Sequence, residues 1–448
     1  MIPGDPNSAV RNEQGLSRQL SMAQQAAMAL GGAIGTGLFL ASGLAVNVAG
    51  PAVIVSYAVV AAISLLLGRA LTEMAVAHPT AGAFGVYAGM YLSPFAGYAM
   101  RVSYLLMEVI ATGGQLVAAS IYMSYWFPGV PGAVWVLAFA VLLVYVNSRA
   151  VGRLGTVEYW LVMIKVVAVA LFVGLAVLIV FGLTGQPALG LRNLTGQGGF
   201  VPFGLKGVWL GCCFVIYSFI GVEIVGVTSG EASNPARTIP VAMRRMVLGL
   251  SAIYIITITL LVALRPWQQL GAGESPFVSV LARVGIPGAA GLMNFVVLSA
   301  ALSSANANLY LISRTLWSLA RAGFVPPRLG AVSRQEVPVN ALLVACLGLG
   351  AAVLVRAVWP NSAYVWFFGV ALFGALFVWL MIFVTHIAFR APAVPLGSYA
   401  GAALVAAILV STWWVPGLKS TLIAGGPWLL LLAIGYRFSG GRSSGSPG

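Results

Sequence analysis

The chain has 448 residues, of which 60% are hydrophobic and only 7% are charged. No soluble domain can bury so large an apolar share, and the short alternating strands of an outer-membrane barrel are absent from the sequence. The composition therefore indicates an all-α integral membrane protein that crosses the bilayer many times. A net charge of +14 would suggest nucleic acid in a soluble protein, but most arginines here stand between apolar runs, where they mark cytoplasmic loops.

The first 20 residues are polar and carry Arg11 and Arg18, and no small-residue cleavage site follows the first apolar run. We predict a short cytoplasmic tail over residues 1–20 and not a signal peptide. The three cysteines lie inside apolar runs and the two histidines are far apart in the chain. Neither a disulfide framework nor a metal site is expected, and no cofactor is predicted.

The hydropathy pattern predicts twelve transmembrane spans, at residues 24–46, 51–76, 95–126, 133–150, 157–182, 205–229, 244–264, 290–319, 339–357, 362–388, 398–415 and 421–437. With the N-terminus inside, most loop arginines fall on the cytoplasmic side, so both termini are expected in the cytoplasm of a multi-pass inner (plasma) membrane protein. The Gly/Ser-rich tail 439–448 is expected to be disordered.

Two of these spans are rich in glycine, which weakens a helix. The first contains "GGAIGTGLF" at Gly31–Phe39, and the sixth contains "YSFIGVEIVGVTSGE" at Tyr217–Glu231, with Glu223 deep in the apolar run. Interrupted helices in corresponding positions of two halves favour a transport site, where freed amides bind a carboxylate and freed carbonyls bind an amine. Close helix packing through small residues is the alternative interpretation.

Five motifs carry a resemblance to a known family: "GGAIGTGLFLASG", "EMAVAHPTAGAF", "EYWLVMIKVVAV", "SFIGVEIVGVTSGEASNPARTIP" and "LSSANANLYLISRTLWSLARAGFVP". From about residue 20 to 437 the chain resembles bacterial amino acid permeases, in the amino acid transporter family of the amino acid–polyamine–organocation superfamily. The resemblance implies a transporter domain over 21–438, with a five-plus-five inverted repeat (about 24–182 and 205–388), broken helices 1 and 6, and two extra helices (398–437). It also implies amino acid uptake, commonly coupled to protons.

The resemblance further implies a substrate site at the two breaks. Amides of the first break would bind the α-carboxylate, and carbonyls of both breaks would bind the α-amine; the matching residues are Ala33, Ile34, Gly35, Thr36, Gly37, Ser218, Phe219 and Ile220. Tyr217 stands where relatives often place an aromatic gate, although the sequence equally allows a membrane-facing ring.

Lys165 is the one lysine inside a predicted span away from its ends, and a central charge is costly there, so it is a functional hypothesis by default. In proton-coupled relatives the matching lysine replaces a sodium ion, with the eighth span flanking it through Ser303 and Ser304. The alternative is a permanently paired structural lysine. Glu223 matches a family acid that couples or gates, or else a buried acid that holds the unwound turn in shape.

The third span departs from the family pattern, because Gln115 stands where relatives usually carry an acid. Glu108 lies seven residues earlier, on the same helix face. It either replaces that acid from a different depth or pairs with Arg101, and the pairing is favoured here. Arg69 and Arg314 are predicted as snorkelling anchors, with gate salt bridges as the alternative.

We therefore expect a permease that imports one amino acid by proton symport with alternating access. The expected substrate is neutral and apolar. If "WFFGVALFG" at Trp366–Gly374 lines the pocket, the side-chain end of the site is apolar, and ordinary helix packing of this segment is the alternative. Cationic amino acids or amines are the alternative substrates, and a substrate-binding nutrient sensor is the alternative from another class. The lack of a nucleophile–His–acid arrangement argues against an enzyme. The expected partners are the amino acid, protons and the lipid bilayer.

Overall fold

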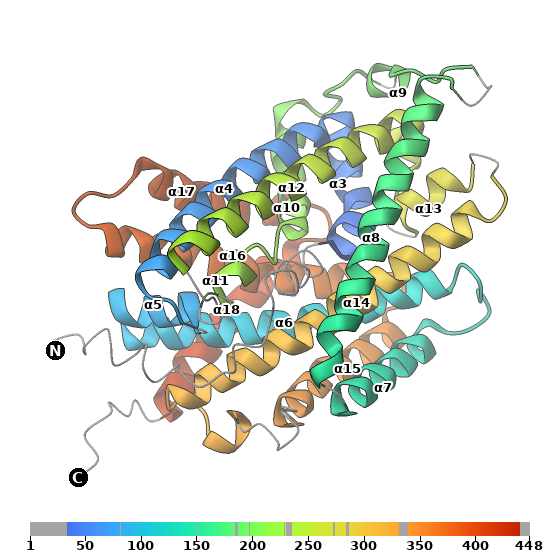
Figure 1. The fold of residues 1–448 in the computed structure, drawn as a ribbon. Coiled ribbons are helices and arrows are strands. Elements are labelled where there is room, and N and C mark those ends of the chain that lie inside the picture. The colour runs from blue at the N-terminus through green and yellow to red at the C-terminus, as the bar shows by residue number, and fades with distance from the viewer. Residues whose placement is uncertain are drawn as a thin grey trace, which may run out of the picture.

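The computed structural model describes residues 34–80, 82–149, 151–183, 187–196, 198–227, 229, 235–271, 274–283, 286–330 and 339–439, and these residues form helices and connecting turns with no strand among them (Figure 1). The predicted tail 1–20, Ala33 and all of the predicted tail 439–448 except Ser439 lie outside the described residues.

The first half of the described chain contains the helical segments η1 (Gly37–Ala41), α3 (Ser42–Ala49), η2 (Gly50–Ala52), α4 (Val53–Ala77), α5 (Ala83–Tyr91), α6 (Pro94–Met123), α7 (Gly132–Arg149), α8 (Val151–Val180), α9 (Arg192–Thr195), α10 (Gly204–Ser218) and α11 (Ile224–Val227). The second half contains α12 (Pro235–Leu264), η4 (Trp267–Gln269), α13 (Pro276–Leu281), α14 (Ala289–Arg321), η5 (Pro327–Gly330), α15 (Val339–Val358), α16 (Ala363–Arg390), α17 (Leu396–Ser411), η6 (Thr412–Trp414) and α18 (Lys419–Phe438).

Eight helical stretches of the described chain are long and apolar enough to cross a membrane, and three shorter apolar helices accompany them. One of the eight, Gly37–Ala77, is 41 residues long and contains parts of two predicted spans, 24–46 and 51–76. Gly50 separates these parts with a positive φ of 64°. The exact count of twelve spans and the repeat architecture stay predictions.

Long helices pack side by side in two main pairs, α4 with α12 and α6 with α14, and α8 crosses both α12 and α14 (Figure 1). α6 also packs against α16, so it lies at the centre of the bundle and most of its side chains are buried. The outer helices expose large apolar side chains to the surroundings, among them Leu205, Leu396 and Phe438, which are 83%, 81% and 85% exposed. Such a surface is stable in lipid and not in water, so the chain is a multi-pass membrane protein.

Candidate functional site

The first predicted break falls at Ile34–Gly37, where the described part of the chain begins and enters η1. The helix that begins at Gly37 has no side-chain hydrogen bond at its N-cap, Thr36. The first amides of a helix have no intrahelical partner and carry partial positive charge, so an uncapped buried start can hold an anion. The carbonyl groups of this segment are already used: Phe39 N–H donates to Gly35 O at 3.2 Å, and the Tyr364 hydroxyl donates to Thr36 O at 3.3 Å.

The second break lies between α10, which ends at Ser218, and α11, which begins at Ile224. Gly221 adopts a φ of 108° in the turn, a conformation that favours glycine. The buried Glu223 carboxylate accepts the Gly221 N–H on both oxygens at 3.1 Å, and Oε2 also accepts the Trp379 indole N–H at 3.2 Å. These contacts are those of an acid that holds the unwound turn in shape; a coupling role of Glu223 stays a prediction.

The two breaks touch through glycine. A Cβ at Gly37 would lie 2.8 Å from the Cα of Ser218 in the second break, and a Cβ at Gly35 would lie 2.6 Å from the Ser304 hydroxyl of α14. Real Cβ atoms do not approach other atoms so closely, so only glycine permits this packing at both positions. Close approach and helix interruption, which the sequence presents as alternatives, occur together here.

A cavity opens beside this contact, between α6, α10 and α14. It is lined by Gly35, Gly37, Met107, Glu108, Ala111, Gln115, Tyr217, Ile220, Gly221, Ile224, Asn308 and Leu311. Five of the predicted substrate-binding residues are therefore in its wall: Gly35, Gly37, Gln115, Tyr217 and Ile220. Ile34, Thr36, Ser218 and Phe219 are buried next to the breaks but are not in that wall.

Two of the carbonyls predicted for the amine already accept hydrogen bonds. Ser218 O accepts the Tyr254 hydroxyl at 2.9 Å, and Phe219 O accepts the Val222 N–H at 3.2 Å. A carbonyl oxygen has two lone pairs, so an amine at either position would share the oxygen with its present partner.

Aromatic rings form one side of the site. Tyr217 lies on Phe368 of α16 with ring centroids 4.3 Å apart, and Phe368 also contacts Tyr364 and Phe214. Tyr217 thus points inward at the cavity and not toward lipid. The predicted wall segment Trp366–Gly374 contributes Phe368 behind Tyr217, whereas Trp366 is 49% exposed on the outside of the bundle.

The predicted pairing of Glu108 with Arg101 is wrong. Arg101 donates from Nε to the Ser318 hydroxyl of α14 at 3.0 Å. Glu108 faces Asn308: when the Asn308 amide is oriented so that its nitrogen donates, it reaches Ser304 O at 3.0 Å and Glu108 Oε2 at 3.2 Å. Sequence reasoning missed Asn308, although its spacing of four residues from Ser304 places both on one face of α14.

Lys165 is fully buried in α8, which packs against α12 and α14. It is not in the wall of the cavity. Ser303 and Ser304, which the sequence places beside it, are also fully buried. A lysine outside the cavity wall can act on transport without contacting the substrate, and its part in proton coupling stays a prediction.

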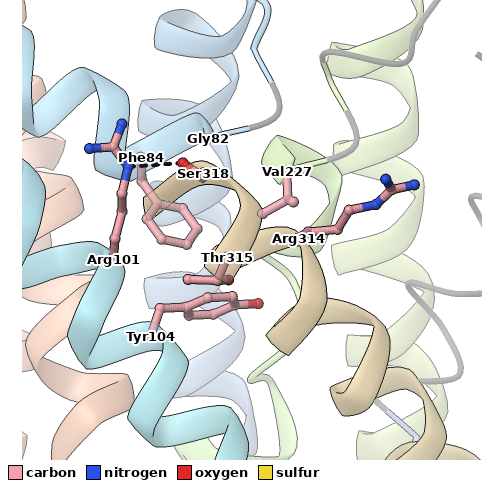
Figure 2. Close-up of a pocket in the computed structure, with 8 residues that line it drawn as sticks. All are labelled: Gly82, Phe84, Arg101, Tyr104, Val227, Arg314, Thr315 and Ser318. Carbon is pink, nitrogen blue, oxygen red and sulfur yellow. Dashed lines mark hydrogen bonds between the residues drawn. The ribbon is translucent and has the colours of Figure 1, made fainter. Parts of the chain in front are cut away.

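A second, smaller cavity lies further along α6 and α14, toward the Pro94 end of α6 (Figure 2). Tyr104 and Arg101 of α6, which line it, lie four and seven residues before Glu108 of the first cavity, and Thr315 and Ser318 of α14 lie four and seven residues after Leu311. Figure 2 shows Arg101 and Arg314 on opposite sides of this cavity, and Arg314 lies over the Tyr310 ring at 4.8 Å. The two cavities thus follow one another along a single helix interface.

Arg69 belongs to a cluster of charged side chains around Glu73. Its Nε lies 3.2 Å from Glu73 Oε1, and Glu73 Oε2 also contacts His386 Nε2 at 3.0 Å and Arg390 Nε at 3.3 Å. His386 Nδ1 shares a hydrogen bond of 2.8 Å with the Ser398 hydroxyl. This Glu73 cluster joins α4, α16 and α17.

Comparison with known proteins matches this arrangement to one family. The profile of the family described as amino acid permease matches residues 25–443. An uncharacterized amino acid permease, YtnA of Bacillus subtilis strain 168, is 35% identical over 95% of this chain and 96% of its own length. The aromatic amino acid transport protein AroP of Escherichia coli K12 is 36% identical over 92% of this chain and 93% of its own. AroP of Shigella flexneri is equally similar. With both helix breaks, the cavity between them and these matches along nearly its whole length, the chain belongs to the amino acid permease family.

Proposed function

We propose that this protein imports an amino acid across the plasma membrane by proton symport with alternating access. The observation that carries the proposal is the meeting of two broken helices at one buried cavity, with an uncapped helix start on one side and turn carbonyls on the other. This pairing suits a zwitterion, because amides attract the carboxylate and carbonyl oxygens attract the ammonium group.

In this proposal the α-carboxylate binds at Gly35–Gly37, and the α-ammonium group lies between the breaks near Ile220. The substrate side chain extends along α6 into the cavity. Access alternates as one helix bundle rocks against the other, and the second cavity along α6 and α14 supports an exit on that side. With both termini in the cytoplasm, as the arginine distribution favours, this side is cytoplasmic.

The proposed substrate is a neutral amino acid with a bulky apolar or aromatic side chain. Support comes from the apolar wall of Met107, Ala111, Ile224 and Leu311, from the aromatic ring of Tyr217, and from the similarity to proteins named for aromatic amino acid transport. A cationic amino acid or a primary amine is the second candidate, and the Glu108 carboxylate in the wall is the observation that favours it.

Lys165 is proposed as the proton carrier, with Glu223 as the second candidate. Support comes from its full burial inside a helix that packs on α14. A lysine there must be neutral or paired, and a change of its surroundings between outward-facing and inward-facing forms would move the proton.

The test is uptake of labelled amino acids into proteoliposomes that hold the purified protein, with and without an imposed pH step. We expect a neutral amino acid to accumulate above its external concentration only when the outside is acidic, and the accumulation to collapse when a protonophore is added. Binding without accumulation would instead identify a sensor, and chemical change of the amino acid an enzyme. Accumulation that does not depend on the pH step would show that transport is not coupled to protons.

A further inference from the structure

Glu108 is a buried acid that the proposed mechanism leaves unused. It lies near the middle of α6, is 3% exposed and forms part of the cavity wall. None of the ion pairs among the described residues includes it. Its neighbour across the cavity is the Asn308 amide, which reaches one of the two carboxylate oxygens. The Tyr104 side chain lies one helical turn earlier on α6, and its buried hydroxyl has no other hydrogen-bond partner among the described residues, so the remaining acceptor capacity of Glu108 is open to Tyr104 or to a bound ligand.

Gln115 presents a second acceptor on the same face of α6. Its side chain is 6% exposed, it lines the cavity, and its Oε1 atom has no hydrogen-bond partner within the described part of the chain. It stands beside the first break, since a Cβ at Gly35 would be 3.5 Å from its Nε2. Glu108 lies seven residues earlier, or about 10 Å along the helix. The two acceptors therefore face the opposite ends of a bound amino acid whose carboxylate is at Gly35–Gly37.

Buried acceptors in an apolar wall are costly unless a donor reaches them. Five apolar side chains share the wall with Glu108, namely Met107, Ala111, Ile220, Ile224 and Leu311. A substrate that ends in a hydrocarbon would keep the carboxyl group from water and give it no hydrogen bond. A substrate that ends in N–H or O–H would give it one.

We infer that Glu108 is the specificity-determining residue of this site and selects amino acids whose side chain ends in a hydrogen-bond donor. The inference rests on the proposed function and defines its substrate class more narrowly: indole N–H and phenol O–H side chains are favoured over plain hydrocarbon rings. A site built to hydrogen-bond a substrate group rejects the analogue that lacks the group far more strongly than an apolar pocket rejects an extra methylene.

The test uses two pairs of amino acids that differ essentially in the donor: tyrosine against phenylalanine, and lysine against norleucine. Initial uptake rates into proteoliposomes give kcat/KM for each, in the wild type, in E108L, which removes the acceptor, and in E108Q, which keeps an acceptor oxygen. E274Q is the matched control, because Glu274 pairs with Arg265 at 3.8 Å, is 57% exposed and is outside the cavity.

We expect the wild type and E274Q to prefer tyrosine over phenylalanine by about 10-fold or more. E108L should bring the ratio near unity by lowering kcat/KM for tyrosine and not for phenylalanine, and E108Q should retain most of the preference. An unchanged tyrosine-to-phenylalanine ratio in E108L, or no preference in the wild type, would overturn the inference.

Three further outcomes distinguish a failure of this inference from a failure of the proposed function. A wild type that accumulates no amino acid refutes the function itself. A Glu108-dependent preference confined to the lysine pair keeps the specificity role of Glu108 and overturns the neutral substrate class. Should E108L fail to insert or fold, judged by gel filtration in detergent, E108A takes its place: loss of the tyrosine preference in E108A with its retention in E108Q supports the role, and an unchanged preference in E108A contradicts it.

Discussion

The two helix breaks differ in whether a side chain of the protein accepts hydrogen bonds from their backbone amides. The second break holds its own acid, because the Glu223 carboxylate accepts the Gly221 amide and the Trp379 indole. The first break has no such side chain: its helix start is uncapped, and glycine packs directly on Ser218 and Ser304. One turn is therefore complete without a ligand, whereas the other offers amides to one. This difference fits the proposal that the first break binds a charged group of the substrate while the second break keeps its own shape.

Substitution of Gly37 is the most direct test of whether the first break binds the substrate. Gly37→Val should reduce the initial uptake rate by at least about 100-fold, since a side chain there meets the Ser218 backbone and separates the two breaks. Gly37→Ala should show most of the same loss. Gly249→Ala in α12 is the control, because a Cβ at Gly249 meets nothing within 4 Å. Normal uptake by Gly37→Ala at equal protein yield would remove the first break from the binding site.

Substitution of Lys165 separates substrate binding at the breaks from accumulation driven by protons. Lys165→Ala should still bind the substrate in calorimetry, because the turn at Gly35–Gly37 is intact, yet lose accumulation driven by a pH step. Counterflow exchange should persist, since it needs only reorientation with substrate bound. Accumulation in response to the pH step by this variant would mean that the proton path is elsewhere, and Glu223 becomes the next candidate.

Substitution of Glu223 tests whether its carboxylate stabilises the turn of the second break. Glu223→Leu leaves the Gly221 and Trp379 donors buried without their acceptor, which costs about 1–3 kcal/mol for each lost partner. The unfolding temperature in detergent should fall and the uptake rate with it. Glu223→Gln should lie between, because its single amide oxygen still accepts. A Glu223→Leu variant with wild-type thermal stability would show that the carboxylate does not hold the turn.

Gln115 should give the smallest change and a different kind of change from Glu108. Gln115→Leu removes the amide group whose Nε2 donor lies beside Gly35, where the carboxylate is proposed to bind, and should weaken binding of every amino acid alike, by about 10-fold. The tyrosine-to-phenylalanine ratio of kcat/KM should not move. A shift in that ratio would place Gln115, and not only Glu108, at the side-chain end of the substrate.

Local sequence features predicted much of this site. The glycines of the first span and the acid in the sixth span were identifiable from the pattern of interrupted helices, and Tyr217 from the resemblance to the family. The surroundings of Glu108 were not. Spacing places Glu108 and Gln115 on one face of α6, but which way that face turns depends on packing between helices. Gly113 of the same helix lies so close to Phe367 of α16 that an added Cβ would be 2.7 Å from the ring, a contact between helices that spacing along one helix does not reveal.

The Glu73 cluster has a mechanical consequence. One carboxylate joins His386 and Arg390 of α16 to its own helix, α4, and His386 continues to Ser398 at the start of α17. The exposed arginines add little energy by themselves, but the buried imidazole between two partners fixes the spacing of three helices at one end. We therefore expect α4, α16 and α17 to move together as a rigid unit during transport, whichever residues act as the hinge. We expect the movement of the transport cycle to occur at other helix contacts, and the interface of α6 and α14, which contains both described cavities, is a candidate.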